Sequence, residues 1–192
     1  MKNFAEELAY WYLRFNGFFP LTNFVLHRQD LLSSQNADAD LIGVRPKFVS
    51  EEIGGNHLDN QLFKNFNRNR NIGVICEVKS GRTDPSDILM AREDRIRYAL
   101  KRLGFFSDEK VHYHMERLEN ESVIRGRFHE VGKVLISDHP SDQPGFICIQ
   151  LDHVESFVME RIELFLPEKN GAKHFFESDI LQYMIWKKHR SE

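Results

Sequence analysis

Two acids and one lysine set in apolar segments are the residues of this sequence best suited to chemistry. Glu77 and Lys79 stand two positions apart in the apolar run 72–80, and Asp40 interrupts a second apolar run, 37–46. Side chains alternate along a strand, so Glu77 and Lys79 should point to one face. Acids on neighbouring strands make a hard-oxygen site suited to Mg²⁺. A lysine beside them would position a water and offset charge that develops on a phosphate.

A structural interpretation of the same residues remains open. Charged groups on a strand built for burial must be paired, bound to an ion, or exposed at an open end of the sheet. Glu77 and Lys79 could therefore be a simple ion pair, with Asp40 exposed to solvent. The Glu-x-Lys spacing alone does not separate this interpretation from a catalytic one.

The elements that must position these residues can be read from hydrophobic periodicity and from helix-ending glycines. The strongest strand is 72–80, and the first helix ends at Gly17. The order of helix, strands, helix, strands and helix predicts α/β packing around a mixed central sheet flanked by helices. The predicted helices are 5–16, 88–103, 107–119, 154–166 and 178–189, and the predicted strands are 18–27, 37–46, 72–80, 133–137 and 146–151.

Composition favours one domain with a sizeable core. The chain has 192 residues, a net charge of −3 and 41% hydrophobic residues, which excludes wholesale disorder. No apolar run approaches the ~18 residues of a membrane helix, so no membrane partner is expected. Cys76 and Cys148 both lie in apolar runs and indicate a reducing, cytoplasmic setting. The connection 47–71 is long for a compact domain and predicts a loop insertion.

Three segments, taken together and in order, resemble the PD-(D/E)XK nuclease superfamily, and within it the compact members similar to Holliday-junction resolvases. The opening helix is Glu-Glu-Leu-Ala-Tyr-Trp-Tyr-Leu-Arg-Phe-Asn-Gly-Phe at 6–18. Asp-Ala-Asp-Leu-Ile at 38–42 is similar to the acid-x-Asp-Leu-Ile strand, and Val-Ile-Cys-Glu-Val-Lys-Ser at 74–80 to the apolar-Glu-x-Lys strand. The likeness covers 5–103. The sequence differs from the superfamily in two ways. An alanine precedes Asp40, where a proline is usual, and the segment between Asp40 and Glu77 is longer than in these families.

The resemblance implies a role for each residue near the central pair. Asp40 and Glu77 would bind Mg²⁺ (or Mn²⁺), with the backbone carbonyl of Val78 as a third ligand. Lys79 would orient the water that attacks phosphorus. These roles rest on the matched positions of the motif.

Further acids join the site by the same resemblance. Glu6 would reach it from the first helix, and Glu7 replaces Glu6 if the helix is rotated. Asp38 has the alternation to share the face of Asp40 and would be an outer acid of the site.

The expected protein is therefore a single α/β domain with a restriction-endonuclease-like core at 5–103, the insertion 47–71, and C-terminal strands with a closing helix at 104–192. The expected function is metal-dependent hydrolysis of phosphodiester bonds, with DNA favoured over RNA as the substrate and an endonuclease favoured over an exonuclease. The resemblance also implies a homodimer or a larger complex.

Two questions stay open at this point. The same fold could serve as a non-catalytic nucleic-acid-binding or protein-interaction module, or act only inside a complex, because a net charge of −3 gives little attraction to DNA. Basic side chains around the insertion and the following helix are either solvated or bound to phosphates. The candidate phosphate contacts are Arg68, Arg70, Arg82 and Arg92.

Overall fold

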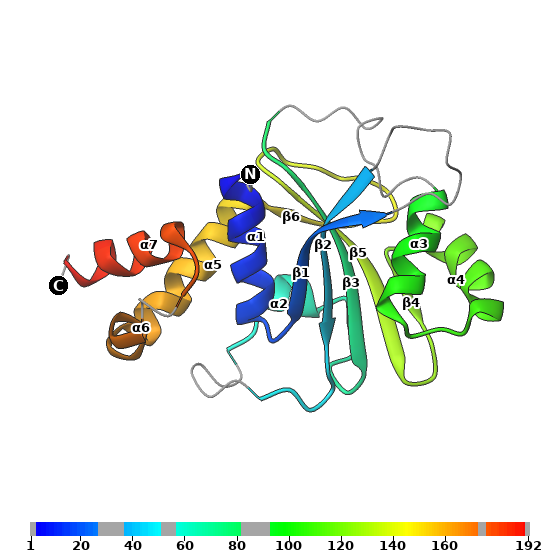
Figure 1. Cartoon of the computed structure of the whole chain (residues 1–192), viewed down its shortest axis with the longest axis horizontal. Helices are drawn as coiled ribbons and strands as arrows, with labels where there is room; N and C mark the ends of the chain where they lie inside the picture. Colours follow the sequence, from blue (N-terminus) through cyan, green and yellow to red (C-terminus); the bar gives the residue numbers. More distant parts are fainter. Residues whose placement is uncertain (1–2, 27–36, 51–56, 82–92, 173–175, 191–192) are drawn as a thin grey trace.

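The computed structural model describes residues 3–26, 37–50, 57–81, 93–172 and 176–190. Helices and strands alternate along the chain, as the sequence predicts (Figure 1). In chain order the elements are α1 (Phe4–Phe15), β1 (Phe19–Leu26), β2 (Ala37–Arg45), α2 (Asn60–Phe63), β3 (Asn71–Lys79), α3 (Glu93–Leu103), α4 (Asp108–Asn120), β4 (Val123–Arg125), β5 (His129–Ser137), β6 (Ile147–Gln150), α5 (Leu151–Leu164), α6 (Leu166–Ala172) and α7 (Asp179–His189).

The strands form one mixed sheet, which confirms the predicted α/β class. The sheet order is β1-β2-β3-β5-β4, with β6 also paired to β5. β2 runs antiparallel to both of its neighbours, β1 and β3, whereas β3 and β5 are parallel. β4 pairs with the first part of β5 and β6 with its last part, so β4 and β6 follow one another along the same edge. β5 follows residue 103, so the predicted core and the C-terminal extension share one sheet.

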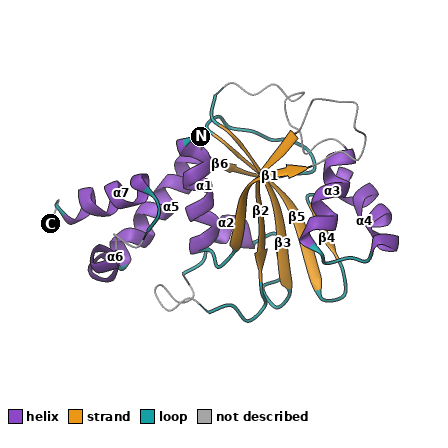
Figure 2. Ribbon diagram, viewed as in Figure 1, coloured by secondary structure: helices purple, strands orange, loops and turns teal. Residues whose placement is uncertain are grey.

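Helices cover both faces of the sheet (Figure 2). β3 shows why, because its side chains are buried on alternate faces. Val74, Cys76 and Val78 belong to the cluster that packs under α1, α5 and α7. Ile75 belongs to the second cluster, which packs under α3 and α4. The run 72–78 is thus apolar on both faces, as expected for a strand in the middle of a three-layer domain.

α1 is held at both ends by local signals in the sequence. The Asn3 side chain accepts a hydrogen bond from the Glu6 backbone N–H at 2.9 Å and donates one to the Glu6 carboxylate at 2.8 Å, which is a reciprocal N-terminal cap. Gly17 ends the helix with a φ of 82°, a left-handed conformation that glycine adopts readily. Leu8 and Tyr12 bury one side of α1, so the direction of Glu6 is fixed by helix geometry.

Besides the short helix α2, the strand β4 and the helix α6 are absent from the elements predicted from the sequence. β4 has three residues, and α6 contains Pro167 and Gly171. The insertion predicted at 47–71 contains the short helix α2, and residues 51–56 within it lie outside the described part. None of the helices in the described ranges is long and apolar enough to cross a membrane.

Candidate active site

The site forms where the ladder between β2 and β3 opens. The two strands pair from Arg45 opposite Ile72 to Leu41 opposite Cys76, which would place Asp40 opposite Glu77. Instead of continued backbone pairing, the Asp40 carboxylate accepts a hydrogen bond from the Val78 N–H at 2.7 Å through Oδ2. The Asp40 side chain thus takes the place of a backbone acceptor on β2. It lies beside the end of β3, where Glu77 and Lys79 are found.

Glu77 and Lys79 lie together near the end of β3. Glu77 is 3% exposed, and Lys79 Nζ lies 2.8 Å from its Oε1. Lys79 keeps 24% of its side-chain surface exposed. The alternation predicted from the sequence therefore brings these two charges to one face, one of them buried and the other facing solvent.

Three charged side chains influence the ionisation of Asp40. The pKa of Asp40 is raised from 3.8 to about 6, chiefly by burial. The hydrogen bond from the Val78 N–H and the positive charge of Lys79 act in the opposite direction and lower this pKa. The charges of Glu77 and Glu6 raise it further. We call Asp40, Glu77, Lys79 and Glu6 the acidic site. It contains three carboxylates and one ammonium, so its acids outnumber its cations.

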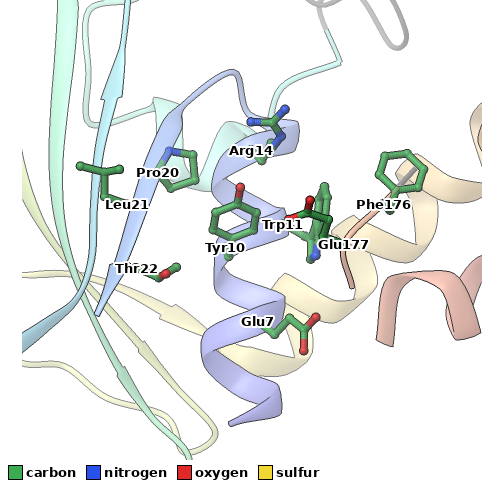
Figure 3. A pocket seen from close by; sticks show the side chains of 9 residues that line it. All are labelled: Glu7, Tyr10, Trp11, Arg14, Pro20, Leu21, Thr22, Phe176 and Glu177. Atoms are coloured by element: carbon green, nitrogen blue, oxygen red, sulfur yellow. The ribbon is translucent and has the colours of Figure 1, made fainter. Parts of the chain in front are cut away.

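The structure also separates Glu6 from Glu7. Glu6 acts on Asp40 through its charge, and Figure 1 shows the first turn of α1 at the end of the sheet where β3 finishes. Glu7 is one residue further around the helix and lines a cleft of about 540 Å³ with Tyr10 and Arg14, between α1 and β1 (Figure 3). The sequence left these two acids as alternatives; only Glu6 is brought to the acidic site.

The backbone of β3 presents a further oxygen at this site. The Lys79 carbonyl accepts a hydrogen bond from the Asp138 N–H at 3.2 Å, so it points toward β5. Backbone groups of successive strand residues point to opposite neighbours. The Val78 carbonyl therefore points toward β2, as does the Val78 N–H that Asp40 binds.

The oxygen atoms of this site are of the kind that binds a hard divalent cation, although only two carboxylates are placed to do so. The Asp40 and Glu77 carboxylates and the Val78 carbonyl supply oxygens of the kind Mg²⁺ and Mn²⁺ prefer. The hydrogen bond to Val78 and the ion pair to Lys79 each use a single carboxylate oxygen. No cluster of three or more His, Cys, Asp or Glu side chains in the described residues is arranged to hold a metal. Two carboxylates and a backbone oxygen, completed by water, are therefore the fitting set.

The arginines of the insertion are not brought to this site. Arg68 and Arg70 precede β3, whereas Glu77 lies near its end, about 20 Å further along at the usual rise per residue. Arg70 Nη1 donates to the Gly126 carbonyl at 2.7 Å and lies 3.6 Å from Glu130 Oε1. Since Glu130 is 1% exposed, Arg70 compensates a buried charge, which is a structural role.

Three other predicted site residues cannot be placed by their side chains. Arg82 and Arg92 lie outside the described residues. Asp38 is on β2 opposite Val25, and its side chain is likewise outside the described part.

Asp138 is a neighbour of the site that the sequence did not identify. It follows β5, and its N–H binds the Lys79 carbonyl. Its Oδ1 is buried without a hydrogen-bond partner, and His139 Nε2 lies 3.9 Å away. The sequence showed only an acid after an apolar run; the parallel pairing of β3 with β5 brings it here, and no local pattern reveals that pairing.

Cys76 and two histidines of α4 take structural places. Cys76 is fully buried, and burial followed by the charges of Asp40 and Glu77 raises the pKa of its thiol, so it is a core residue. On α4, the exposed side chain of His112 lies beside Glu116. The ring of His114 stacks on that of Phe106, with 3.8 Å between the ring centroids.

No family model, curated protein or solved structure matches this chain.

Proposed function

We propose that this chain is a metal-dependent nuclease that hydrolyses phosphodiester bonds, in DNA in preference to RNA, as an endonuclease. The observation that carries the proposal is the imbalance of the acidic site. Where the β2–β3 ladder opens, burial raises the pKa of Asp40, the charges of Glu77 and Glu6 raise it further, and only Lys79 offers a compensating positive charge. A structural ion pair needs no second or third acid, whereas a cation site does.

A bound Mg²⁺ or Mn²⁺ would supply Lewis acidity and neutralise charge on the phosphate. Asp40, Glu77 and the Val78 carbonyl are the residues that would hold it. The Lys79 ammonium, partly exposed beside Glu77, would donate hydrogen bonds to the attacking water and to a phosphate oxygen. In the overall reaction water adds to phosphorus, the bond to the leaving sugar oxygen breaks, and that oxygen gains a proton. Glu6 would accept hydrogen bonds from water at the rim.

The proposal extends to setting and assembly. Cys76 and Cys148 are both free thiols, which agrees with a reducing, cytoplasmic compartment. A homodimer or a larger complex would let two acidic sites act on two strands of a duplex.

A non-catalytic nucleic-acid-binding or interaction module on the same fold is the second candidate, and specific contacts favour it. The Asp40 carboxylate already satisfies the Val78 N–H, and the Glu6 carboxylate already accepts from Asn3 at the cap of α1. Glu77 already pairs with Lys79. Each member of the acidic site thus also has a structural contact.

Metal binding and cleavage by charge-removing variants separate the two candidates. The wild-type protein and Glu77→Gln are melted with and without Mn²⁺ and assayed on branched, duplex and single-stranded DNA and on RNA. We expect Mn²⁺ to raise the melting temperature of the wild type only, and cleavage to be lost in the variant.

Glu6→Gln and Glu7→Gln form the matched pair for α1. They are adjacent and have the same charge, but only Glu6 acts on Asp40, so only its variant should slow cleavage. A wild type that neither responds to Mn²⁺ nor cleaves any of these substrates would leave the interaction module as the function.

A further inference from the structure

The outer side of α7 carries two exposed aromatic rings with a cation against each. Tyr183 is 54% exposed and Trp186 is 44% exposed. With Lys187 and Arg190 they stand at positions i, i+3, i+4 and i+7 of the helix, which is one continuous stripe along its length. We call these four residues the aromatic face of α7.

The geometry of this face is that of a platform. The rings of Tyr183 and Trp186 have centroids 6.0 Å apart and planes inclined by 33°. Lys187 Nζ lies 5.9 Å from the Tyr183 ring, and Arg190 Cζ lies 5.0 Å from the Trp186 ring. Both cations are within the distance at which a positive charge is attracted to an aromatic ring.

The aromatic face is not needed to hold α7 in place. Leu181, Met184 and Ile185 are buried on the opposite side, where the helix packs against α5 and α6. The Ser178 side chain accepts from the Leu181 N–H at 3.1 Å and caps the start of the helix. Figure 1 shows α7 at the end of the molecule farthest from α3 and α4, so its outer side lies away from the sheet.

We propose that the aromatic face of α7 binds single-stranded nucleic acid, with bases stacked on Tyr183 and Trp186 and phosphates bound by Lys187 and Arg190. Aromatic platforms flanked by cations are what a strand without base pairs requires, because every base has a π face and every linkage a negative charge. The inference rests on the proposed nuclease function. It deepens that function by naming a substrate with unpaired strands, held at a surface separate from the acidic site.

Charge favours this occupant over a lipid surface or an apolar protein partner. Leu181 and Ile185 are buried and Ile180 is partly buried, so the outer face offers two rings and no wide apolar stripe. Lys187 and the C-cap residue Arg190 put two positive charges on this face in a chain with a net charge of −3, whereas Lys188 is paired with Glu163 at 2.9 Å. A local positive charge against that background complements a polyanion.

The test is binding of a fluorescent oligothymidylate without divalent metal, so that no cleavage occurs. We expect Tyr183→Ala and Trp186→Ala each to weaken binding at least about fivefold. Tyr183→Phe should retain it, because the ring remains. Lys187→Ala with Arg190→Ala should lower the salt slope by about 0.7 for each phosphate that is no longer neutralised.

Tyr113→Ala is the matched control. Tyr113 is also an exposed tyrosine, 58% accessible, with Arg117 Cζ 5.7 Å from its ring. Both residues are on α4, and Glu121 holds Arg117 through two hydrogen bonds. This variant should bind the oligonucleotide as the wild type does. Thermal melts of all variants check folding, which substitution of exposed side chains should leave intact.

Trp fluorescence gives a second readout, because the chain has two tryptophans and Trp11 is 7% exposed whereas Trp186 is 44% exposed. Quenching by the oligonucleotide should vanish in Trp186→Phe and persist in Trp11→Phe. Wild-type protein that fails to bind the oligonucleotide, or equal losses in the Tyr113 and Tyr183 variants, would overturn the inference. Glu77→Gln should still bind the oligonucleotide, so loss of cleavage with retained binding would support the inference. A wild type that binds the oligonucleotide but cleaves no substrate would count against the nuclease proposal alone.

Discussion

Replacing Asp40 by asparagine should stabilise the protein at neutral pH while removing its response to metal. Asparagine retains an oxygen that can accept the hydrogen bond from the Val78 N–H. It removes a charge whose ionisation is opposed by burial and by the charges of Glu77 and Glu6. Active sites commonly sacrifice stability in this way, so stabilisation by a neutral substitute is expected of a functional acid.

The size and pH dependence of the effect follow from the pKa of Asp40. A change from 3.8 to about 6 corresponds to at most about 3 kcal/mol. Because Asp40 is partly exposed, solvent screening reduces this to about 1–2 kcal/mol. Between these two pKa values the folded protein keeps a proton that the unfolded chain has released, so wild-type stability falls as pH rises. Asp40→Asn has no such proton to release, so its stability does not fall over this interval. Its gain in stability over the wild type should be absent below pH 3.8 and complete above about pH 6.

Urea unfolding of both proteins at pH values spanning this interval measures the effect, and thermal melts should show a rise of about 2–8 °C above the upper pKa. Added Mn²⁺ should raise the melting temperature of the wild type and not that of Asp40→Asn. A variant that is destabilised equally at every pH would refute the reasoning, because it would make Asp40 a structural partner of Val78 and nothing more.

Asp59→Asn is the matched control for this substitution. Asp59 is 6% exposed, but its carboxylate accepts several hydrogen bonds. It accepts hydrogen bonds from the Tyr12 hydroxyl and, at 2.9 Å, from the Gln61 N–H, and His153 Nε2 lies 2.8 Å from its Oδ2. An amide has only one oxygen and loses part of this set, so Asp59→Asn should destabilise by about 1.5–3 kcal/mol. Opposite signs for two aspartates in one chain would show that the gain at Asp40 is local.

Two further substitutions test the acidic site and the insertion. Lys79→Met should keep the Mn²⁺-induced rise in melting temperature, since a protonated lysine is not a ligand, yet slow cleavage by about 10²–10³-fold in a single-turnover assay; unchanged cleavage would remove Lys79 from the chemistry. Arg70→Ala should lower the free energy of unfolding by about 1–3 kcal/mol, because buried Glu130 loses a partner 3.6 Å away. The same variant should leave the salt dependence of DNA binding unaltered, and a flatter dependence would return Arg70 to the phosphate contacts.

The fold class and the central residues of the site could be predicted because their signals are local. The sequence predicted a helix at 5–16, and α1 is Phe4–Phe15, since its cap, its apolar side and its terminal glycine are all encoded within it. β3 was equally clear, because it is apolar on both faces. α6 was missed because it contains Pro167 and Gly171, residues that usually end a helix rather than build one.

What could not be predicted depends on contacts between distant segments. Arg70 was left as either solvated or bound to phosphate, but its partner Glu130 lies 60 positions further along the chain, on β5. Asp138 only follows an apolar run in the sequence, and the pairing of Lys79 with Ser137 brings it beside the site. Charged residues of this kind have no periodicity, so their roles become visible only when strand order and register are known.

The position of the acidic site in the sheet explains how a strand can carry both a structural and a chemical role. β3 is antiparallel to β2 and parallel to β5. Beyond Leu41 and Cys76 the β2 side opens while the β5 side stays paired to Lys79. A buried N–H cannot be left without a partner at low cost, and Asp40 supplies that partner with a carboxylate. The same opening leaves the Val78 carbonyl directed toward β2. Closing the ladder with an ordinary backbone pair would satisfy β3 equally well, but it would use the backbone oxygen on which the proposed chemistry depends.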